Sequence, residues 1–430
     1  MLDRKFILEN LEAVRSNCIN RGIDVDLDRL VELNDRRRKL QQELDGLNQE
    51  SNATAKSIKG AKDADERQKL IDRGKELRNR RNEVEEELQG VADELESLQS
   101  IIPNMSHPAA PIGASDADNV EFERGSTPIP EFDFKAQDHL EIGERLDLID
   151  MEAGSKVTGH GFYFLKNDAV LLDLALQNYA LGILMRDGFA PISTPDLARN
   201  EVMQGTGYVP RGPETQIYSI ADTDLSLIAT SEITLAGLQA GEIIAPEQLP
   251  IKLCGISHCF RTEAGAYGRA SRGLYRVHQF TKVEMFAFTL PGESPQMHDR
   301  MLDLEKQIFD GLGIPYRVIE NATGDLGAAA YRKYDLEAWM PGRGDTGEFG
   351  EITSTSNCTD YQARRLNIRY RGEDGKVAGF LHTLNGTAIA ISRALIAILE
   401  NYQQADGTVR VPQVLRPHVG KDVIVPVSGH

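Results

Sequence analysis

The sequence has 430 residues and a hydrophobic content of 40%, enough for a large core and for about three domains of ordinary size. Its 48 Lys and Arg residues are outnumbered by 66 Asp and Glu residues. The resulting net charge of −18 excludes a protein that binds nucleic acid over its whole surface. Any contact with nucleic acid must therefore come from a local basic patch.

The cysteines and the N-terminus predict a cytoplasmic protein. The four cysteines are too scattered for a disulfide framework, a pattern that suits a reducing compartment. Asp3 and Glu9 stand where a signal peptide would need an unbroken apolar run. The most apolar segments, 169–185 and 387–399, are interrupted by polar residues and fall short of the roughly 20 apolar residues that a membrane span needs. We therefore expect no membrane association.

Residues 27–102 contain no aromatic residue and no proline, and their apolar residues follow the 3,4 spacing of a coiled coil. The pattern weakens around Gly60, which predicts two helices folded back as an antiparallel hairpin. Because the two apolar seams bury each other and little else, the hairpin should be an arm within an N-terminal domain of residues 1–102. The seams consist of Leu30, Leu33, Leu40, Leu44, Leu47, Ile58, Leu70, Leu77, Val84, Leu88, Val91, Leu95, Leu98 and Ile102.

Each predicted helix of this arm contains a cluster of basic side chains. If the chain turns near residue 60, two arginine runs become neighbours and form a local basic patch on an acidic protein. The alternative is a solvated coiled-coil face with ion pairs three or four residues apart, and charge alone leaves both readings open. The arginines considered for contact with nucleic acid are Arg36, Arg37, Arg38, Arg78, Arg80 and Arg81.

Five prolines between residues 103 and 130 predict an extended linker, after which a second domain should occupy residues 131–430. Alternating apolar and charged residues in that domain favour an antiparallel sheet with one buried face. We predict helices at about 136–150, 168–187, 294–312 and 386–403. We predict strands at 253–260, 275–289, 316–319 and 348–356.

The sequence has no Walker loop and no dinucleotide fingerprint, so phosphate binding would depend on arginines. Arg261 and Glu263 share one face of a predicted strand, where a structural salt bridge is the alternative. Glu351 and the hydroxyls that follow it suit Mg²⁺ bound together with phosphate, although they are equally compatible with an edge strand. Arg393, in a helix of small apolar residues, needs an anion or an acidic partner.

Two further segments have competing readings. Thr230 and Ser231 precede a helical run, so either can be a helix N-cap, and capping does not exclude ligand binding. Cys254, His258 and Cys259 could be read as metal ligands, but neighbouring residues on a strand point to opposite faces and a fourth ligand is missing. We therefore expect no zinc.

Taken together, five segments resemble seryl-tRNA synthetase of the bacterial type, a class II aminoacyl-tRNA synthetase. Each segment alone is a weak signal, but five in this order behind a heptad hairpin are specific. The resemblance covers essentially the whole chain, including the arm and the Ile102–Pro103–Asn104 hinge. The segments are 230–232, 260–263, 276–284, 350–364 and 383–403.

The resemblance implies an α+β fold: the class II antiparallel sheet flanked by helices, preceded by the coiled-coil arm. It implies an enzyme that activates L-serine with ATP and Mg²⁺ to seryl-adenylate and transfers the seryl group to tRNA(Ser), and to tRNA(Sec) where present. The partners would be the long variable arm of the tRNA and a second copy of the chain in a homodimer. A carrier-protein ligase is a rival that would lack the arm, and a catalytically silent paralogue is a rival that would not need intact Arg261, Glu263 and Arg393.

The resemblance also assigns roles to individual residues. Arg261, Glu351 and Arg393 would be catalytic, and Glu351 and Ser354 would hold the metal. The ATP site would consist of Arg261, Thr262, Glu263, Val277, Phe280, Glu351, Ile352, Thr353, Ser354 and Arg393. The serine site would consist of Thr230, Ser231, Glu232, Arg261, Glu284, Asn385 and Thr387.

Two positions depart from the family pattern. Thr387–Ala388 replaces the commoner Ser-Gly, which keeps a hydroxyl but leaves the pocket size open. The turn at 159–162 lacks the arginine expected before its aromatic residue.

Overall fold

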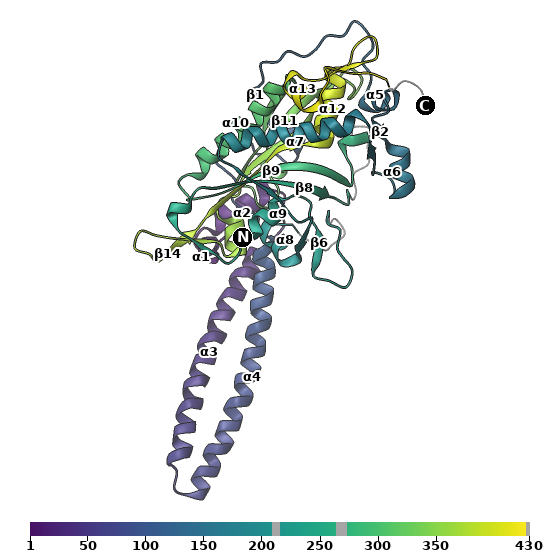
Figure 1. Ribbon diagram of the computed structural model, residues 1–430. Helices are drawn as coiled ribbons and strands as arrows, with labels where there is room; N and C mark the ends of the chain where they lie inside the picture. Colours follow the sequence, from purple (N-terminus) through teal and green to yellow (C-terminus); the bar gives the residue numbers. More distant parts are fainter. Residues whose placement is uncertain (209–215, 264–272, 427–430) are drawn as a thin grey trace. The chain divides into compact units, whose positions relative to one another are not determined.

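The computed structural model describes residues 1–208, 216–263 and 273–426 (Figure 1). The chain forms two compact units, an N-terminal unit of Met1–Pro103 and a C-terminal unit of Asn104–His430. The boundary falls at the first proline of the segment predicted to be a linker.

The N-terminal unit is a long helical hairpin with two short helices before it. The short helices are α1 (Arg4–Glu9) and α2 (Leu11–Asn20), and the long ones are α3 (Leu27–Gly60) and α4 (Ala64–Ile101). Asp26 and Asp63 cap the two long helices by accepting hydrogen bonds from backbone amides of their first turns. The chain reverses at residues 61–63, as the sequence predicts, and Figure 1 shows α3 and α4 side by side.

The predicted leucine seam holds the hairpin together. Seam residues on both helices are buried, including Leu40 on α3 and Leu77, Val84 and Val91 on α4. The predicted coiled-coil arm is therefore confirmed, and the helices depend on each other because isolated polar helices are marginal in water.

Four ion pairs join α3 to α4, one for every seven residues along each helix. Such exposed pairs contribute only ~0.2–1 kcal/mol each. Pairs that flank a coiled-coil seam also set its register, because a slip of one helix would place like charges opposite each other. The pairs are Arg29–Glu94, Arg36–Glu87, Glu43–Arg80 and Glu50–Arg73.

The C-terminal unit is built on an eight-stranded sheet in the order β1-β10-β11-β12-β15-β9-β8-β4. Neighbouring strands are antiparallel except β4 and β8, which are parallel. The strands are β1 (Val120–Arg124), β10 (Tyr316–Glu320), β11 (Arg332–Met340), β12 (Glu348–Asn357), β15 (His382–Ala390), β9 (Gln279–Thr289), β8 (Ile251–Phe260) and β4 (Ala190–Ser193).

The two faces of the sheet bury different partners. On β9, Val283 and Met285 belong to the main core, which they share with α7 (Asp168–Arg186), α10 (Ser294–Leu312) and α12 (Ile391–Asn401). Phe286 and Phe288 point the other way, into a smaller core with α9 (Glu232–Gly237) and α11 (Tyr361–Leu366). Because side chains alternate along a strand, the even-numbered residues of β9 all face this second side.

Shorter elements complete the C-terminal unit. The helices are α5 (His139–Arg145), α6 (Met151–Val157), α8 (Asn200–Thr206) and α13 (Arg416–Val419). The strands are β2 (Ile149–Asp150), β3 (Phe164–Leu165), β5 (Leu197–Arg199), β6 (Leu225–Leu227), β7 (Ile243–Ile244), β13 (Arg369–Arg371), β14 (Val377–Phe380), β16 (Val409–Arg410) and β17 (Val423–Ile424). A 3₁₀ turn, η4, spans Gly273–Tyr275.

Most predicted elements are present, and the differences have physical reasons. The helix predicted at 386–403 begins only at 391, because residues 382–390 pair with β9 and β12 as β15. The helix predicted at 136–150 is shorter and ends at Arg145. The linker prediction for 103–130 misses β1, which pairs with β10 at the edge of the sheet. The predicted helices at 168–187 and 294–312 correspond to α7 and α10.

Candidate active site

A cleft of about 300 Å³ opens on the face of the sheet that carries the even-numbered residues of β9. It brings together residues that are up to 187 positions apart in the chain, from Thr206 at the end of α8 to Arg393 in α12. The predicted site residues that line it are Glu232, Arg261, Glu263, Val277, Phe280, Glu284, Glu351, Ile352, Thr353, Ser354, Asn385, Thr387 and Arg393.

One end of the cleft is acidic, and Glu232 lies there almost fully buried. Its Oε1 accepts hydrogen bonds from Gln362 Nε2 at 2.6 Å and Asn385 Nδ2 at 2.9 Å, and its Oε2 accepts one from the Tyr208 hydroxyl at 3.3 Å. Burial, followed by the charge of Glu284, raises the pKa of the Glu232 carboxyl to about 7. Near neutral pH this carboxyl is therefore poised between its two protonation states.

Glu284 shares this end of the cleft with a lysine. Its Oε2 lies 2.5 Å from Lys282 Nζ and accepts a hydrogen bond from the Thr387 hydroxyl at 3.2 Å. Lys282 Nζ also donates to Thr230 Oγ1 at 2.8 Å. Two carboxylates and one ammonium group are thus enclosed within a few residues of one another, which leaves the acidic end with an excess of negative charge.

Two residues predicted to bind serine and one predicted to bind ATP do not line the cleft. Thr230 reaches it through Lys282 and also accepts a hydrogen bond from the Glu232 amide, which is the predicted capping interaction. Ser231 makes no such bond and packs against Gly255 of β8, where a Cβ would lie 2.8 Å from the Ser231 Oγ. The amide of Thr262 donates to the carbonyl of Gln216.

The other end of the cleft is basic. Arg393 Nη1 lies 3.1 Å from Glu351 Oε2 and donates to the Glu351 carbonyl at 2.9 Å. Its Nε donates to the carbonyl of Tyr275 at 3.3 Å, and its guanidinium carbon lies 4.6 Å from the centre of the Tyr275 ring. The acidic partner that the sequence requires for Arg393 is therefore Glu351.

The second arginine of the basic end is held over an aromatic ring. Arg261 lies 5.3 Å from the centre of the Phe280 ring, and the Arg261 carbonyl lies 2.9 Å from His278 Nδ1. Glu263 has a left-handed backbone conformation with φ of 49° and pairs with Arg276 at 3.3 Å. Non-glycine residues adopt this conformation rarely, and they often do so at functional sites.

On β12, neighbouring residues divide between the two faces of the sheet. The Thr353 hydroxyl donates to Glu305 on α10 at 3.0 Å, and Ile352 belongs to the main core. Ser354 is paired in register with Asp335 of β11. Of the two predicted metal ligands, Glu351 is engaged by Arg393, and both it and Ser354 line the cleft.

The three residues that could be read as zinc ligands, Cys254, His258 and Cys259, do not line the cleft. Cys254 and Cys259 are buried, whereas His258 is exposed and its Nδ1 lies 3.1 Å from Asp196. Across residues 1–208, 216–263 and 273–426, no three His, Cys, Asp or Glu side chains are grouped as metal ligands would be.

Comparison with known proteins identifies the fold. Residues 1–106 match the family model described as the seryl-tRNA synthetase N-terminal domain. Residues 218–402 match that of the class II tRNA synthetase core domain for G, H, P, S and T. The chain is 58% identical to the serine–tRNA ligase of Rhodopirellula baltica over 424 residues and 58% identical to that of Rubrobacter xylanophilus over 426 residues, with 99% of each chain covered.

The chain belongs to the seryl-tRNA synthetase family. A solved structure, seryl-tRNA synthetase from Pyrococcus horikoshii complexed with ATP, superposes with a TM-score of 0.91 at 40% identity and covers 100% of both chains. The resemblance stated from the motifs is confirmed, as is the class II fold. The activity of the chain is that of its family, the ligation of serine to tRNA.

Sequence reasoning missed several side chains that line the seryl-tRNA synthetase cleft, among them Lys282, Tyr275, Arg276 and Lys333. Lys282 lies between two recognised residues on β9, and its even number is a signal that could have identified it, since Phe280 and Glu284 share that face. Tyr275 and Arg276 fall inside the strand predicted at 275–289, but β9 begins only at Gln279 and Tyr275 belongs to η4. Lys333 lies on β11, a strand that was not predicted.

Proposed function

We propose that the cleft holds L-serine at its acidic end and ATP at its basic end. The observation that supports this division is the placement of charge. Glu232 and Glu284 lie at one end with Lys282, whereas Arg261, Arg276, Arg393 and Lys333 lie toward the other with Glu263 and Glu351. An ammonium group suits the first end and phosphate groups suit the second.

At the acidic end, the carboxylates of Glu232 and Glu284 would bind the serine ammonium group. The Thr387 hydroxyl and the Asn385 amide, both bonded to these carboxylates, would lie beside the substrate. A polar wall of this kind discriminates against an amino acid without the hydroxyl, because the wall would be left with unpaired polar groups. Arg261, at the junction of the two ends, would bridge the serine carboxylate and the α-phosphate.

At the basic end, the chain would act by positioning and charge neutralisation. The serine carboxylate attacks the α-phosphorus, the bond from that phosphorus to the pyrophosphate oxygen breaks, and pyrophosphate leaves. Phe280 would stack on adenine, Glu263 would accept a hydrogen bond from its amino group, and Arg393 would bind the γ-phosphate. A hydroxyl of the terminal ribose of tRNA then attacks the seryl carbonyl carbon, the bond from that carbon to the phosphate oxygen breaks, and AMP leaves. The ATP bound by the Pyrococcus horikoshii relative supports this assignment.

The residues present fit Mg²⁺ bound together with a nucleotide. Glu351 offers one carboxylate and Ser354 one hydroxyl on the same cleft wall. Mg²⁺ usually takes one or two carboxylates and completes its shell with water and substrate phosphates. When bound, the ion would neutralise phosphate charge, and Glu351 and Ser354 would hold it while Arg393 keeps the Glu351 side chain in place.

The division of the cleft is tested by two isosteric variants. Glu284→Gln removes a charge at the acidic end, so the KM for serine should rise roughly 10- to 100-fold while the KM for ATP changes little. Glu263→Gln is the matched control and should raise the KM for ATP instead. Both constants come from serine-dependent ATP–pyrophosphate exchange, with threonine and alanine as non-cognate substrates. An equal rise of both constants in Glu284→Gln would refute the assignment.

We further propose that the helical arm binds the long variable arm of tRNA(Ser) through phosphate contacts. Ion pairs occupy Arg36 and Arg80, and Arg81 lies 3.5 Å from Glu85. Arg38 and Arg78 are exposed and make no hydrogen bond or ion pair with any residue of the described ranges. These two arginines are therefore the members of the predicted basic patch most available to RNA. Charging of tRNA(Sec) and a cytoplasmic location stay predictions of the resemblance.

A charge swap provides the control for the arm. Arg38→Glu with Arg78→Glu should raise the KM for tRNA about tenfold or more, with a salt-dependent loss, and leave pyrophosphate exchange unchanged. Arg36→Glu with Glu87→Arg keeps both the ion pair and the net charge, and should have a much smaller effect. Equal effects of the two double variants on the KM for tRNA would contradict the proposal.

We also propose a homodimer formed through α7 and β4. Helix α7 is the one helix within the described ranges that is long and apolar enough to cross a membrane by length and composition. Its Leu172 and Leu176 are buried in the main core, while Leu171 and Leu174 on another face are 39% and 52% exposed. The neighbouring β4 is an edge strand of the sheet. An apolar helix face beside an open strand edge fits a second copy of the chain.

Placing a charge on this face tests the dimer. Sedimentation of the native chain should give twice its 47.6 kDa mass, and Leu174→Glu should reduce the mass to that of one chain at micromolar concentration. Val157→Glu changes an exposed apolar residue of α6 and should leave the dimer intact. A native chain that sediments at 47.6 kDa would contradict the proposal.

A further inference from the structure

A buried histidine and a buried glutamate lie beyond the basic end of the cleft. A second cavity, of about 440 Å³, is lined by His139 of α5 and Glu400 of α12. Tyr275 lines both this cavity and the cleft. His139 belongs to no motif considered in the sequence, Glu400 lies in the segment 383–403 without an assigned role, and neither residue lines the cleft.

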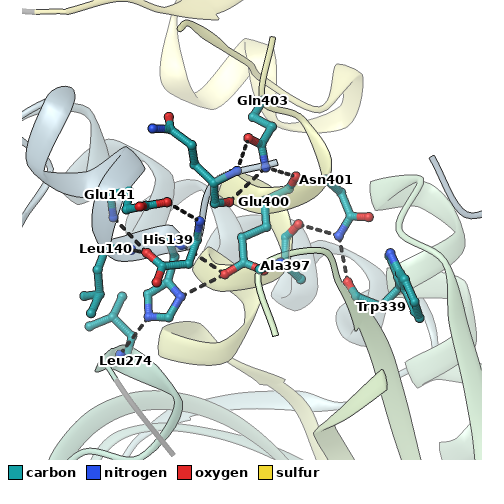
Figure 2. Close-up of polar contacts among 12 residues, drawn as sticks. His139, Leu140, Glu141, Leu274, Trp339, Ala397, Glu400, Asn401 and Gln403 are labelled. Atoms are coloured by element: carbon teal, nitrogen blue, oxygen red, sulfur yellow. Dashed lines mark hydrogen bonds and ion pairs between the residues drawn. The ribbon is translucent and has the colours of Figure 1, made fainter. Parts of the chain in front are cut away.

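Glu400 joins three segments of the chain through one carboxylate. Its Oε1 accepts hydrogen bonds from the His139 backbone amide at 3.0 Å and from His139 Nδ1 at 2.9 Å, and its Oε2 accepts one from the Gly342 amide at 2.8 Å. Figure 2 shows the contacts between His139 and Glu400, with Gln403 bonded to the Glu400 carbonyl. The side chain is only 2% exposed, so removing these donors would leave a buried carboxylate without partners.

His139 connects Glu400 to the turn η4 through a second hydrogen bond. Its Nε2 accepts a hydrogen bond from the Leu274 backbone amide at 3.2 Å, while its Nδ1 donates to Glu400. The two contacts together define a neutral imidazole with its proton on Nδ1. The Leu274 amide is buried in the protein interior with this ring nitrogen as its acceptor.

Two glycines show how closely the backbone approaches the pair. A Cβ on Gly273, whose φ is +67°, would lie 2.2 Å from His139 Nε2. A Cβ on Gly342 would lie 3.0 Å from the Glu400 carboxyl carbon and 2.6 Å from the Asp138 Cα. A side chain at either glycine would displace His139 or Glu400. The backbone at Gly273 and Gly342 therefore passes too close to the pair for a larger residue.

Tyr275, which follows Leu274 in η4, contacts Arg393 of the cleft. Tyr275 accepts the hydrogen bond from Arg393 Nε through its carbonyl, and its ring lies against both Arg393 and Arg343, at 4.6 Å and 4.2 Å. Any shift of Leu274 would move the Tyr275 carbonyl and ring together. A continuous series of contacts therefore connects Glu400 to Arg393 through His139, Leu274 and Tyr275.

We propose that His139 and Glu400 are positioning residues for ATP: they fix turn η4 so that Tyr275 holds Arg393 where the nucleotide phosphates bind. This inference rests on the proposed role of Arg393 at the basic end. Neither residue lines the cleft, and the polar partners of Glu232 and Glu284 in the described part of the chain lie outside η4, so the effect should fall on ATP and spare serine.

Three variants of the full-length chain test the pair in pyrophosphate exchange. His139→Ala removes the acceptor for the Leu274 amide, and kcat/KM for ATP should fall roughly tenfold while the KM for serine stays within about twofold. His139→Gln offers an amide oxygen to Leu274 and an amide N–H to Glu400, and should restore kcat/KM for ATP to within about threefold of the native value. Glu400→Gln is isosteric but places a donor against His139 or Gly342, so it should lower kcat/KM for ATP as His139→Ala does.

Asn401→Ala is the matched control. Asn401 follows Glu400 on α12, and its amide donates to the carbonyls of Trp339 and Ala397, away from η4. It should lower the melting temperature without changing the KM for ATP. If His139→Ala and Glu400→Gln match Asn401→Ala in ATP kinetics, or if His139→Gln is as impaired as His139→Ala, the positioning role is refuted. If the native chain shows no serine-dependent exchange, the proposed function itself has failed.

Discussion

The cleft depends on the burial of two carboxylates beside one ammonium group. Burial of a charge is costly unless partners surround it, and here Glu232 has three hydrogen-bond donors while Glu284 has Lys282 and Thr387. One strand supplies both members of the ion pair, because residues two apart on β9 share a face. When both carboxyls are ionised, Glu232 and Glu284 carry one more charge than Lys282 neutralises. We propose that the serine ammonium group supplies the missing positive charge.

The same alternation organises the rest of the C-terminal unit. Val283, Met285 and Ala287 of β9 are packed in the main core with α7, α10 and α12, so the strand that carries the cleft residues is supported from its other face. The arginines that would bind phosphates are held separately, Arg261 by the Phe280 ring and Arg393 by Glu351 and Tyr275. In the N-terminal unit, by contrast, the helices are held by a leucine seam and by ion pairs at heptad spacing. The alternation of side chains along the strands therefore specifies the C-terminal unit, and the seven-residue repeat of the helices specifies the N-terminal unit.

The sequence predicts those parts of the structure that depend on local repeats. Heptad leucines identify the hairpin and the position of its turn, and motif residues identify thirteen of the residues that line the cleft. The start of α12 could not be read locally, because residues 386–390 become a strand only through pairing with β9 and β12. Tyr275 was missed because its role comes from neighbours distant in the chain, whereas Lys282 could have been identified from the alternation of side chains along β9. The arginine patch of the arm was only partly resolved, since Arg36 and Arg80 have acidic partners on the facing helix, which only the register of the hairpin reveals.

Proton release on serine binding tests the charge deficit of the acidic end most directly. The raised pKa of Glu232, about 7, means that this carboxyl is largely protonated at pH 6, and a bound ammonium group would lower that pKa and expel the proton. Calorimetric titration with L-serine in buffers of different ionisation enthalpy should therefore show close to one proton released at pH 6 and progressively fewer as the pH rises through 7 and above. Glu232→Gln should release none. Serine binding at pH 6 with a heat independent of the buffer, or with the same proton release in Glu232→Gln, would contradict the account.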